Sequence, residues 1–423
     1  MLMKKVIIIM LTLTLGMLHT FARGMQHSGD AVTINGIVKD AHSKKKLANV
    51  SVHLQGRDIG TVTNGDGMFS LKIDREDLEG NILLSCLGYT NRKIACRDLS
   101  GNGGNATVFL TPAARTLGEV TVYGGDAKNL VVEAMKRIDA NYPQTPNMLN
   151  MFYRETIMKG SRYVGISEGV MDVYKNGYGK RTTDRDRVRI KRGRRLMSQK
   201  ANDTLAVKLQ GGPLLAVYLD IVKNGDVLFD DETLPLYSFK HEQMIMLDDR
   251  LHYAVSFKPC ATVDYPLYSG TLYIDSESLC LTRAEITLDV SDREKTNRAL
   301  LQRKPLGLRF RCREASIIVA YRQHDGRACL DYIRNTIRFK CDWKRRLFSS
   351  TYTTVAEMVT VDLDNQPAAN IPHSESYRDS RMFYDDARQN WDADFWKDYN
   401  IIEPTESLEK AVEKLRRHNK KDK

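Results

Sequence analysis

Residues 61–70 read TVTNGDGMFS, and this stretch decides the fold of the N-terminal part of the chain. Gly65 and Gly67 alternate with Asn64 and Asp66, between apolar residues. Gly, Asn and Asp tolerate the positive φ angles of a tight turn, so the pattern predicts a corner between two strands. A calcium loop is the alternative, but such loops repeat acidic ligands over about twelve residues, and here apolar residues follow at once.

The segments around this corner alternate with a period of two residues. Alternation is clear in VSVHL (50–54), MFSLKI (68–73) and NILLSCLGY (81–89). Short alternating runs separated by turn sequences are typical of a small β-sandwich. We therefore predict a small, Ig-like β-sandwich over residues 31–113.

The first residues have the features of a secretory signal peptide, predicted over residues 1–22. Lys4 and Lys5 precede an apolar run from 6 to 18, and Ala22 follows at a suitable cleavage position. The run is shorter than the roughly 20 residues of a membrane span, which leaves an uncleaved anchor as the weaker alternative. The chain is therefore expected to be exported, to the periplasm or the outer membrane.

Residues 114–146 are predicted to link two domains through a strand and a helix. GEVTVYGG (118–125) reads as a strand. Beyond it, apolar residues from 130 to 138 fall on one helical face, with Asp126 as N-cap.

Residues 147–363 return to strand-like alternation and predict a curved antiparallel sheet resembling a half-barrel. Its longest strands flank Asp325-Gly326, a strong hairpin signal. With that turn, Cys312 faces Phe339 and Cys341 faces Phe310. The two thiols are then diagonal neighbours, too far apart for an unstrained disulfide. We expect the seven cysteines of the chain to be mostly buried free thiols, with one or two bridges left open.

One predicted helix interrupts these strands, at GGPLLAVYLDIVKNG (211–225). Pro213 opens it and Asn224-Gly225 closes it. Placed on the concave side of the sheet, it would either fill the core or border a groove for an apolar ligand. In the groove interpretation the lining residues are Leu214, Leu215, Tyr218 and Ile221.

Residues 364–423 form a predicted C-terminal extension that ends in a short basic amphipathic helix. Leu408, Val412 and Leu415 lie on one face of it, and a cluster of Lys and Arg follows. Such a helix either docks on the body of the protein or contacts a membrane surface.

The net charge of +11 comes largely from residues 181–200, which hold nine Lys or Arg and two Asp. A solvated loop is the plainer interpretation of this excess, and contact with an anionic membrane or with lipopolysaccharide is the other. No aromatic residues are interleaved to stack on bases, so nucleic-acid binding is not expected. The residues proposed for this contact are Arg187, Arg189, Lys191, Arg192, Arg194 and Arg195.

No pattern in the chain predicts an enzyme, a metal site or a cofactor site. Gly165-Ile166-Ser167-Glu168-Gly169 fits the GxSxG motif of serine hydrolases, but strand-like text flanks it on both sides, whereas the motif needs a strand, a turn and a helix. Neither HExxH nor CxxC occurs. A hydrolase that uses Ser167 is kept as an alternative.

Four stretches together resemble the carboxypeptidase-regulatory-like domain: GIVKD (36–40), LANVSV (47–52), GTVTNGDGMFSL (60–71) and LGY (87–89). The resemblance implies a transthyretin-like sandwich without catalytic residues of its own. LGEVTVYGG (117–125) is similar to the segment that follows this domain in TonB-dependent outer-membrane receptors. Too few residues remain for the 22-stranded barrel of such a receptor, but the resemblance implies that machinery as a partner.

The remainder of the chain resembles the soluble portion that follows this domain in exported proteins of Gram-negative bacteria. At the level of fold alone it is similar to the curved sheets of lipoprotein-carrier proteins. The expected function is that of a non-enzymatic docking or binding protein with an envelope protein partner. A periplasmic carrier of a lipid or another apolar ligand is the alternative.

Overall fold

The computed structural model describes residues 31–100, 106–113, 125–200, 203, 205–209, 211–225, 230–343, 349–364, 368–378, 383–387, 396 and 399–421. The predicted signal peptide and, apart from Gly125, the strand predicted at 118–125 lie outside these residues. None of the described helices is long and apolar enough to cross a bilayer.

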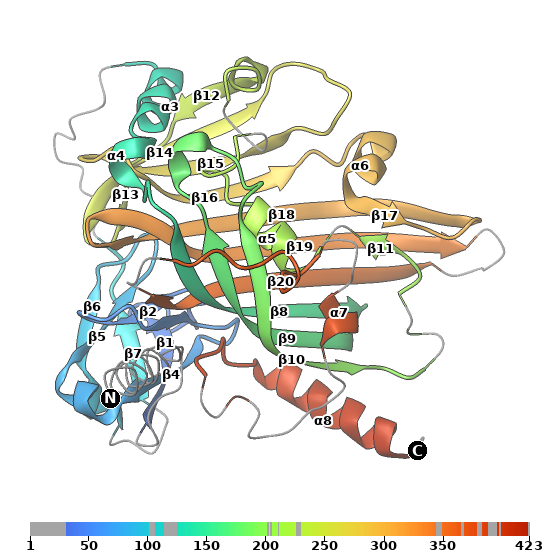
Figure 1. Ribbon diagram of the computed structural model, residues 1–423, viewed down its shortest axis with the longest axis horizontal. Coiled ribbons are helices and arrows are strands. Elements are labelled where there is room, and N and C mark those ends of the chain that lie inside the picture. The colour runs from blue at the N-terminus through green and yellow to red at the C-terminus, as the bar shows by residue number, and fades with distance from the viewer. Residues whose placement is uncertain are drawn as a thin grey trace, which may run out of the picture.

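Two small sheets make up the N-terminal sandwich (Figure 1). In the first, β1 (Ala31–Asp40) pairs with β4 (Met68–Asp74) and, in parallel, with β7 (Ala106–Leu110). The second has the order β3 (Gly60–Val62), β2 (Ser51–Leu54), β5 (Asn81–Ser85) and β6 (Arg92–Ala95), after which comes α2 (Cys96–Ser100). Their inward side chains form one apolar core.

An open antiparallel sheet of eleven strands forms the rest of the body, so the predicted mainly β fold with a second curved sheet is confirmed. Its path starts with β10 (Arg187–Met197), β9 (Arg162–Lys175), β8 (Asn147–Lys159), β20 (Ser350–Asp364) and β19 (Arg327–Trp343). It continues through β18 (Leu308–His324), β16 (Leu281–Leu288), β15 (Tyr268–Asp275), β14 (Arg250–Pro259) and β12 (Tyr237–His241), and β13 (Ile245–Leu247) also pairs with β14. The ends do not meet to close a barrel.

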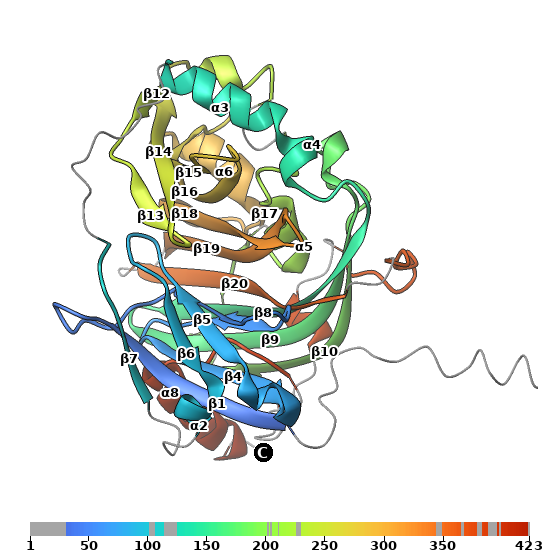
Figure 2. The ribbon, with the colours of Figure 1, turned by 90° about the vertical axis from the view of Figure 1, so that its left-hand side faces the viewer.

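Helices line the inside of this curve and its upper end (Figures 1 and 2). These are α3 (Ala127–Lys136), α4 (Ile138–Asn141), α5 (Pro213–Tyr218) and α6 (Arg293–Leu300). Residues of α3, α4 and α5 join the largest apolar core, together with inward side chains of the sheet. The short ribbon of β11 (Lys208–Leu209) and β17 (Leu301–Arg303) crosses the opening, and α7 (Phe383–Asp386) lies beside β10.

The sandwich packs on the face of the sheet that is opposite to the helices. Side chains along β8 alternate between the two faces, so this strand contributes to both. Tyr153 points into the main core, whereas Phe152 joins a separate cluster with Val62 of the sandwich and Trp396. The carboxylate of Asp331, at a bulge in β19, adds a polar contact 3.7 Å from the His53 ring of the sandwich. The two domains therefore share a buried interface.

The Asn64–Gly67 corner connects β3 and β4, as predicted. The Asn64 side-chain oxygen accepts from the backbone N–H groups of Asp66 and Met68, at 2.8 and 3.0 Å. Gly67 has φ +70°, and a Cβ there would lie 2.6 Å from a backbone oxygen. Because Asn64 is committed to the turn in this way, the calcium alternative gains no support.

The same corner holds the C-terminal segment against the sandwich. The Asn64 amide donates to the carbonyls of Glu403 and Pro404, both at 3.0 Å. Asp66 accepts from the backbone N–H of Glu406, at the start of α8 (Glu406–Lys421). The apolar face of α8 then packs on β9 and β10, as a docked amphipathic helix should. The corner therefore ties together parts of the chain that lie far apart in sequence.

All seven cysteines are free, and most of them are buried. The register around Cys312, Phe339, Cys341 and Phe310 is the predicted one. No bridge forms.

Candidate binding pocket

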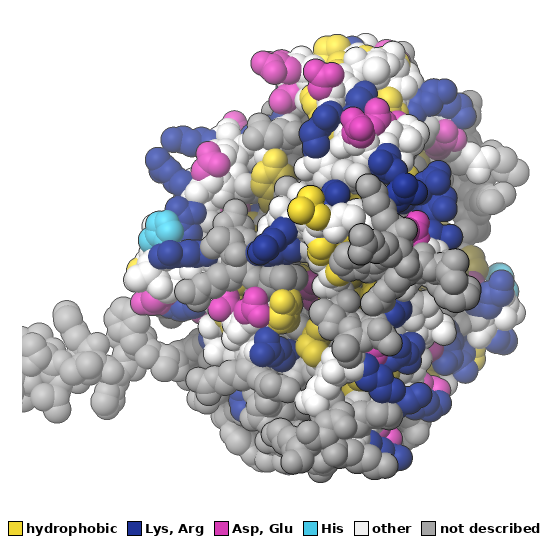
Figure 3. All heavy atoms as spheres, turned by 90° about the vertical axis from the view of Figure 1, so that its right-hand side faces the viewer, with side chains coloured by type: hydrophobic (Ala, Val, Ile, Leu, Met, Phe, Trp, Pro, Cys, Tyr) yellow, Lys and Arg dark blue, Asp and Glu magenta, His cyan; other side chains and the backbone are white. Residues whose placement is uncertain are grey.

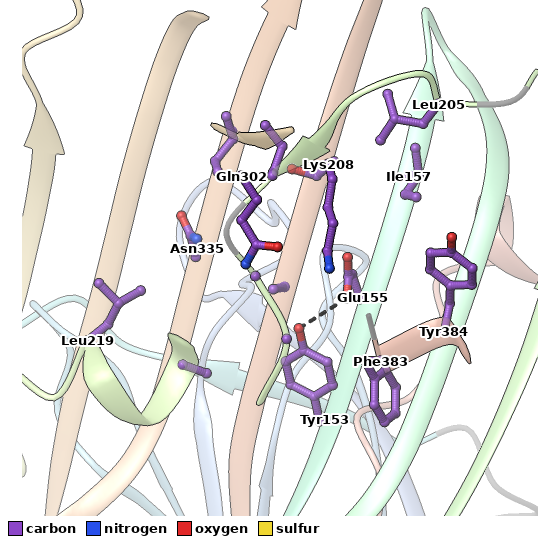
Figure 4. A pocket seen from close by; sticks show the side chains of 17 residues that line it. Tyr153, Glu155, Ile157, Leu205, Lys208, Leu219, Gln302, Asn335, Phe383 and Tyr384 are labelled. Atoms are coloured by element: carbon purple, nitrogen blue, oxygen red, sulfur yellow. Dashed lines mark hydrogen bonds between the residues drawn. The ribbon is translucent and has the colours of Figure 1, made fainter. Parts of the chain in front are cut away.

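A pocket lies where the inner face of β8, β20 and β19 meets the segments that cross the opening of the sheet. Tyr153, Glu155 and Ile157 project into it from alternate positions of β8. Ala216 and Leu219 from the α5 region cover one side, and α7 covers another with Phe383 and Tyr384 (Figure 4). The pocket has two chambers that share four lining residues, Ile157, Leu205, Lys208 and Tyr384.

The inner chamber is small and polar at its base. It encloses about 50 Å³, which is room for one or two water molecules rather than an organic ligand. The Tyr153 hydroxyl donates to Glu155 at 3.3 Å, and Figure 4 shows Lys208 pointing toward the same carboxylate. Burial raises the pKa of Glu155, although the hydrogen bond from Tyr153 opposes the shift.

The outer chamber is much larger, about 660 Å³, and opens to solvent. This volume lies within the range of small-molecule binding sites. Its lining is apolar with a basic component: Ile157, Val164, Met197, Leu205, Ala206, Val207 and Pro305 stand with Arg195, Lys208 and Arg303. Among the described residues that line it, Asp203 is the only acidic one, and it already accepts two hydrogen bonds from Arg162 at 2.5 and 2.6 Å.

Of the four residues predicted to line a groove, the three with described side chains, Leu214, Tyr218 and Ile221, lie elsewhere than in the two chambers. Helix α5 ends at Tyr218, well before Asn224-Gly225, where the sequence predicts its end. Ile221 is 1% exposed within the main core, Tyr218 is 43% exposed, and Leu214 packs against the edge of the core. The side chain of Leu215 lies outside the described part of the chain. The same segment does reach the pocket, but through Ala216 and Leu219.

The helix ends early because the residues after it enter a buried polar network. Asp220 accepts hydrogen bonds from the hydroxyls of Tyr178 and Tyr321 at 2.8 and 2.6 Å, and lies 2.8 Å from the amine of Lys175. Burial lowers the pKa of the neighbouring Lys223 to about 8. This network fills the space beside α5. Its side chains are almost fully enclosed, so we assign it a structural role.

The six predicted anion-binding residues lie on the edge strand β10 and not in a loop. Arg189 pairs with Asp172 and Glu375, and Lys191 also pairs with Asp172. Arg187 donates to backbone carbonyls of the preceding turn, and Arg192 is exposed. Acidic partners therefore neutralise much of the excess charge that the sequence shows.

The remaining two of these arginines contribute to different sites. Arg194 is buried and pairs with Glu168, at 2.7 Å. Arg195 lines the outer chamber, where it donates to the Tyr384 carbonyl and lies 3.7 Å from Asp385. Of the predicted set, Arg195 alone is among the lining residues of the pocket.

Glu168, inside the GxSxG pattern, makes a buried ionic cluster that the sequence did not predict. It accepts from Arg154 and Arg194 at 2.7 and 2.8 Å, and from the Trp396 indole at 3.0 Å. Burial alone would raise the pKa of Glu168, but the two arginines and these hydrogen bonds bring it below its usual value. The available signal was a carboxylate between the runs YVGI (163–166) and GVM (169–171) of the same strand.

Ser167 itself lies in the interior of β9, paired with Glu155 on one side and Arg195 on the other. It is 4% exposed, and the strand continues straight through it, so the strand–turn–helix geometry of a nucleophile elbow is missing. Within the described residues the carboxylates of Asp74, Glu76 and Asp77 come within 4.8 Å of one another, but Glu76 and Asp77 both pair with Arg57. Neither place presents a formed catalytic or metal centre.

Comparison with known proteins gives a family match for the sandwich and structural similarity over part of the chain. No curated protein matches the chain significantly. Three solved structures are similar over part of it. A DUF1329 family protein from Desulfovibrio piger has 12% identity, with 60% of this chain and 100% of that chain covered and a TM-score of 0.27. A putative outer membrane lipoprotein-sorting protein domain from Vibrio parahaemolyticus has 11% identity, 59% and 94% coverage, and a TM-score of 0.25. A lipovitellin structure has 8% identity, 54% and 26% coverage, and a TM-score of 0.27.

No functional conclusion follows from structural similarity this low. The family comparison is firmer, because residues 34–122 match the model of the CarboxypepD_reg-like domain. This match confirms the resemblance that the Asn64–Gly67 corner and its neighbouring strands indicate. The chain therefore carries a CarboxypepD_reg-like domain, followed by a large open curved sheet.

Proposed function

We propose that this protein is an exported, non-enzymatic binding protein that holds an apolar ligand in the outer chamber of its curved sheet. The single observation that carries the proposal is the chamber itself, with about 660 Å³ and seven apolar lining residues. Export is supported by the basic start and short apolar run of the N-terminus. The docking partner and the TonB-dependent machinery stay predictions.

In this proposal the sandwich is a support for the sheet. It contacts the sheet through an apolar cluster and through the C-terminal segment, so the two domains pack against each other directly. The sandwich contacts the face of the sheet that is opposite to the pocket. It packs on β8, the strand that supplies side chains both to this contact and to the pocket. A rigid backing of this kind favours a preformed pocket.

Native mass spectrometry of the purified exported protein tests the proposal, together with titration of the fluorescent apolar probe N-phenyl-1-naphthylamine. We expect retained lipid-like mass or saturable probe binding. Ala206→Phe places a large ring in the chamber and should abolish both, whereas Ala140→Phe on the exposed face of α4 is the matched control and should change neither. A wild-type protein with neither bound mass nor probe binding would refute the proposal.

A further inference from the structure

The turn that joins β17 to β18 displays a leucine at its tip. Leu306 is 98% exposed, whereas Tyr265, the next most exposed large apolar side chain among the described residues, is 50% exposed. The backbone N–H of Leu308 donates to the Pro305 carbonyl at 3.3 Å, and Gly307 has φ +81°, as at the third position of a type II turn. Leu308 itself packs into an apolar cluster of the sheet. The turn therefore presents Leu306 to solvent and keeps its neighbour buried.

Positive charge surrounds this tip. Residues 301–313 include five Lys or Arg and no Asp or Glu. All five are exposed: Arg303, Lys304, Arg309, Arg311 and Arg313. Arg309 and Arg311 lie on the outer face of β18, because Phe310 between them points into the apolar cluster of the inner face. Figure 3 looks onto this end of the molecule, where Lys and Arg side chains gather around scattered hydrophobic ones.

The acidic groups nearby do not balance these cations. Among the described residues, no carboxylate makes an ion pair with any of the five. Asp342 is the cross-strand partner of Arg309, and Asp289 borders the same surface groove as Arg311, but neither forms an ion pair with its neighbour. Glu314 pairs with an arginine of β19 at 3.3 Å. This end of the sheet therefore keeps its positive charge, whereas acidic partners offset much of the charge on β10.

An exposed apolar tip among cations fits a bilayer that contains anionic lipids. Burial of a leucine side chain favours binding by about tenfold or more, and each Lys or Arg near an anionic surface adds about fivefold. Attachment that combines an apolar and an electrostatic contribution is more stable than either alone. A soluble acidic partner would use the charge but would leave Leu306 in water.

We propose that this end of the molecule docks on an anionic lipid bilayer, with Leu306 inserted among the lipid chains and the five cations against the headgroups. Arg303 and Pro305 also line the outer chamber, so a bilayer held at this turn lies beside the chamber. The inference concerns a surface and does not depend on a ligand in the chamber. Either proposal can therefore fail without the other.

Co-sedimentation of the purified exported protein with lipid vesicles tests the docking. Vesicles of equimolar phosphatidylcholine and phosphatidylglycerol should bind the wild type, and vesicles of phosphatidylcholine alone should bind it at least about tenfold more weakly. Added salt should weaken binding to the anionic vesicles.

Variants locate the contact. Leu306→Ser should weaken binding to the anionic vesicles by about tenfold, and Arg309→Gln and Arg311→Gln by about fivefold each. The matched controls are Leu251→Ser, at a 36% exposed leucine of β14, and Arg137→Gln, at an exposed arginine after α3. Both controls should bind as the wild type does. Melting temperatures of all variants verify folding.

A fluorescent variant reports insertion directly. Leu306→Trp should keep binding, and lipids with brominated chains should quench its emission more than that of the wild type, which has three tryptophans.

The remaining outcomes overturn the inference. Equal binding to both kinds of vesicle, or binding to neither, excludes docking on an anionic bilayer. Unchanged binding of Leu306→Ser would make this end a general site for polyanions, which an acidic protein could equally occupy. Weaker binding of the two controls would assign the effect to the overall charge and apolar surface of the protein.

Discussion

Replacing Glu168 by Gln should destabilise the protein strongly, because the substitution leaves two arginines buried without their shared counter-charge. The Glu168 side chain is 1% exposed and holds Arg154, Arg194 and the Trp396 indole. Breaking a buried ion pair by removal of one partner costs about 3–5 kcal/mol. For a domain of this size we expect the melting temperature to fall by roughly 10 °C.

The matched control is Glu375→Gln, the same substitution in an exposed ion pair. Glu375 is 51% exposed and lies 3.0 Å from Arg189. Exposed pairs contribute less than about 1 kcal/mol, so this variant should melt within a few degrees of the wild type. Scanning calorimetry and urea unfolding of both variants measure the difference.

The dependence on pH gives a second readout for Glu168. Its pKa is lower in the folded protein than in the unfolded chain, so the stabilisation is fully present above the ordinary value of 4.5. It is lost as the pH falls through the folded pKa. The gap between wild type and Glu168→Gln should be constant from pH 8 to about pH 5 and should narrow at more acidic pH. A variant as stable as the wild type at pH 7, or a gap that does not change in acid, would refute the reasoning.

Three further outcomes are expected. Asn64→Ala leaves the turn amides and two carbonyls of the C-terminal segment without their hydrogen-bond partner, which costs about 1–3 kcal/mol for each group that stays buried. The variant should be cleaved faster by trypsin within α8, and unchanged cleavage would show that Asn64 does not hold the C-terminal segment. Arg303→Glu creates an opposite-charge pair with Lys208 and should raise the urea midpoint of the unliganded protein by the equivalent of about 0.5 kcal/mol, so a lower midpoint would show that the two cations do not repel. The wild type and Ser167→Ala should be equally unreactive toward a fluorophosphonate probe, and labelling of the wild type alone would revive the hydrolase alternative.

The long hairpin shows how far local sequence determines this fold. The Asp325-Gly326 turn forms with both residues at positive φ, as the sequence predicts. The predicted register is confirmed at both ends of the hairpin, although two bulges interrupt it. Arg313 is the extra residue in β18 and Asp331 in β19, and the two insertions cancel. Bulges respond to tertiary contacts, here the approach of the sandwich to Asp331, and alternation along a strand does not encode them.

The pocket and the basic segment were harder to predict for the same physical reason. The charge of the segment is offset by Asp172 and Glu168 on β9 and by Glu375, far along the chain. Pairing across strands and between distant segments decides which cations remain available. The sequence therefore identified a source of positive charge, but only the fold shows that Arg195 reaches the outer chamber while Arg194 is buried.

The hydrogen bonds between the Asn64 corner and the C-terminal segment also constrain the order of folding. The hydrogen bonds of Asn64 join residues 339 and 340 positions apart. Loop closure over such a distance is slow and entropically costly unless other contacts have already shortened it. The strands of the sandwich all lie within residues 31–110, so it can form early, but the side chain of Asn64 lacks its C-terminal partners until the segment after Trp396 is in place. The formation of these hydrogen bonds therefore marks the completion of folding.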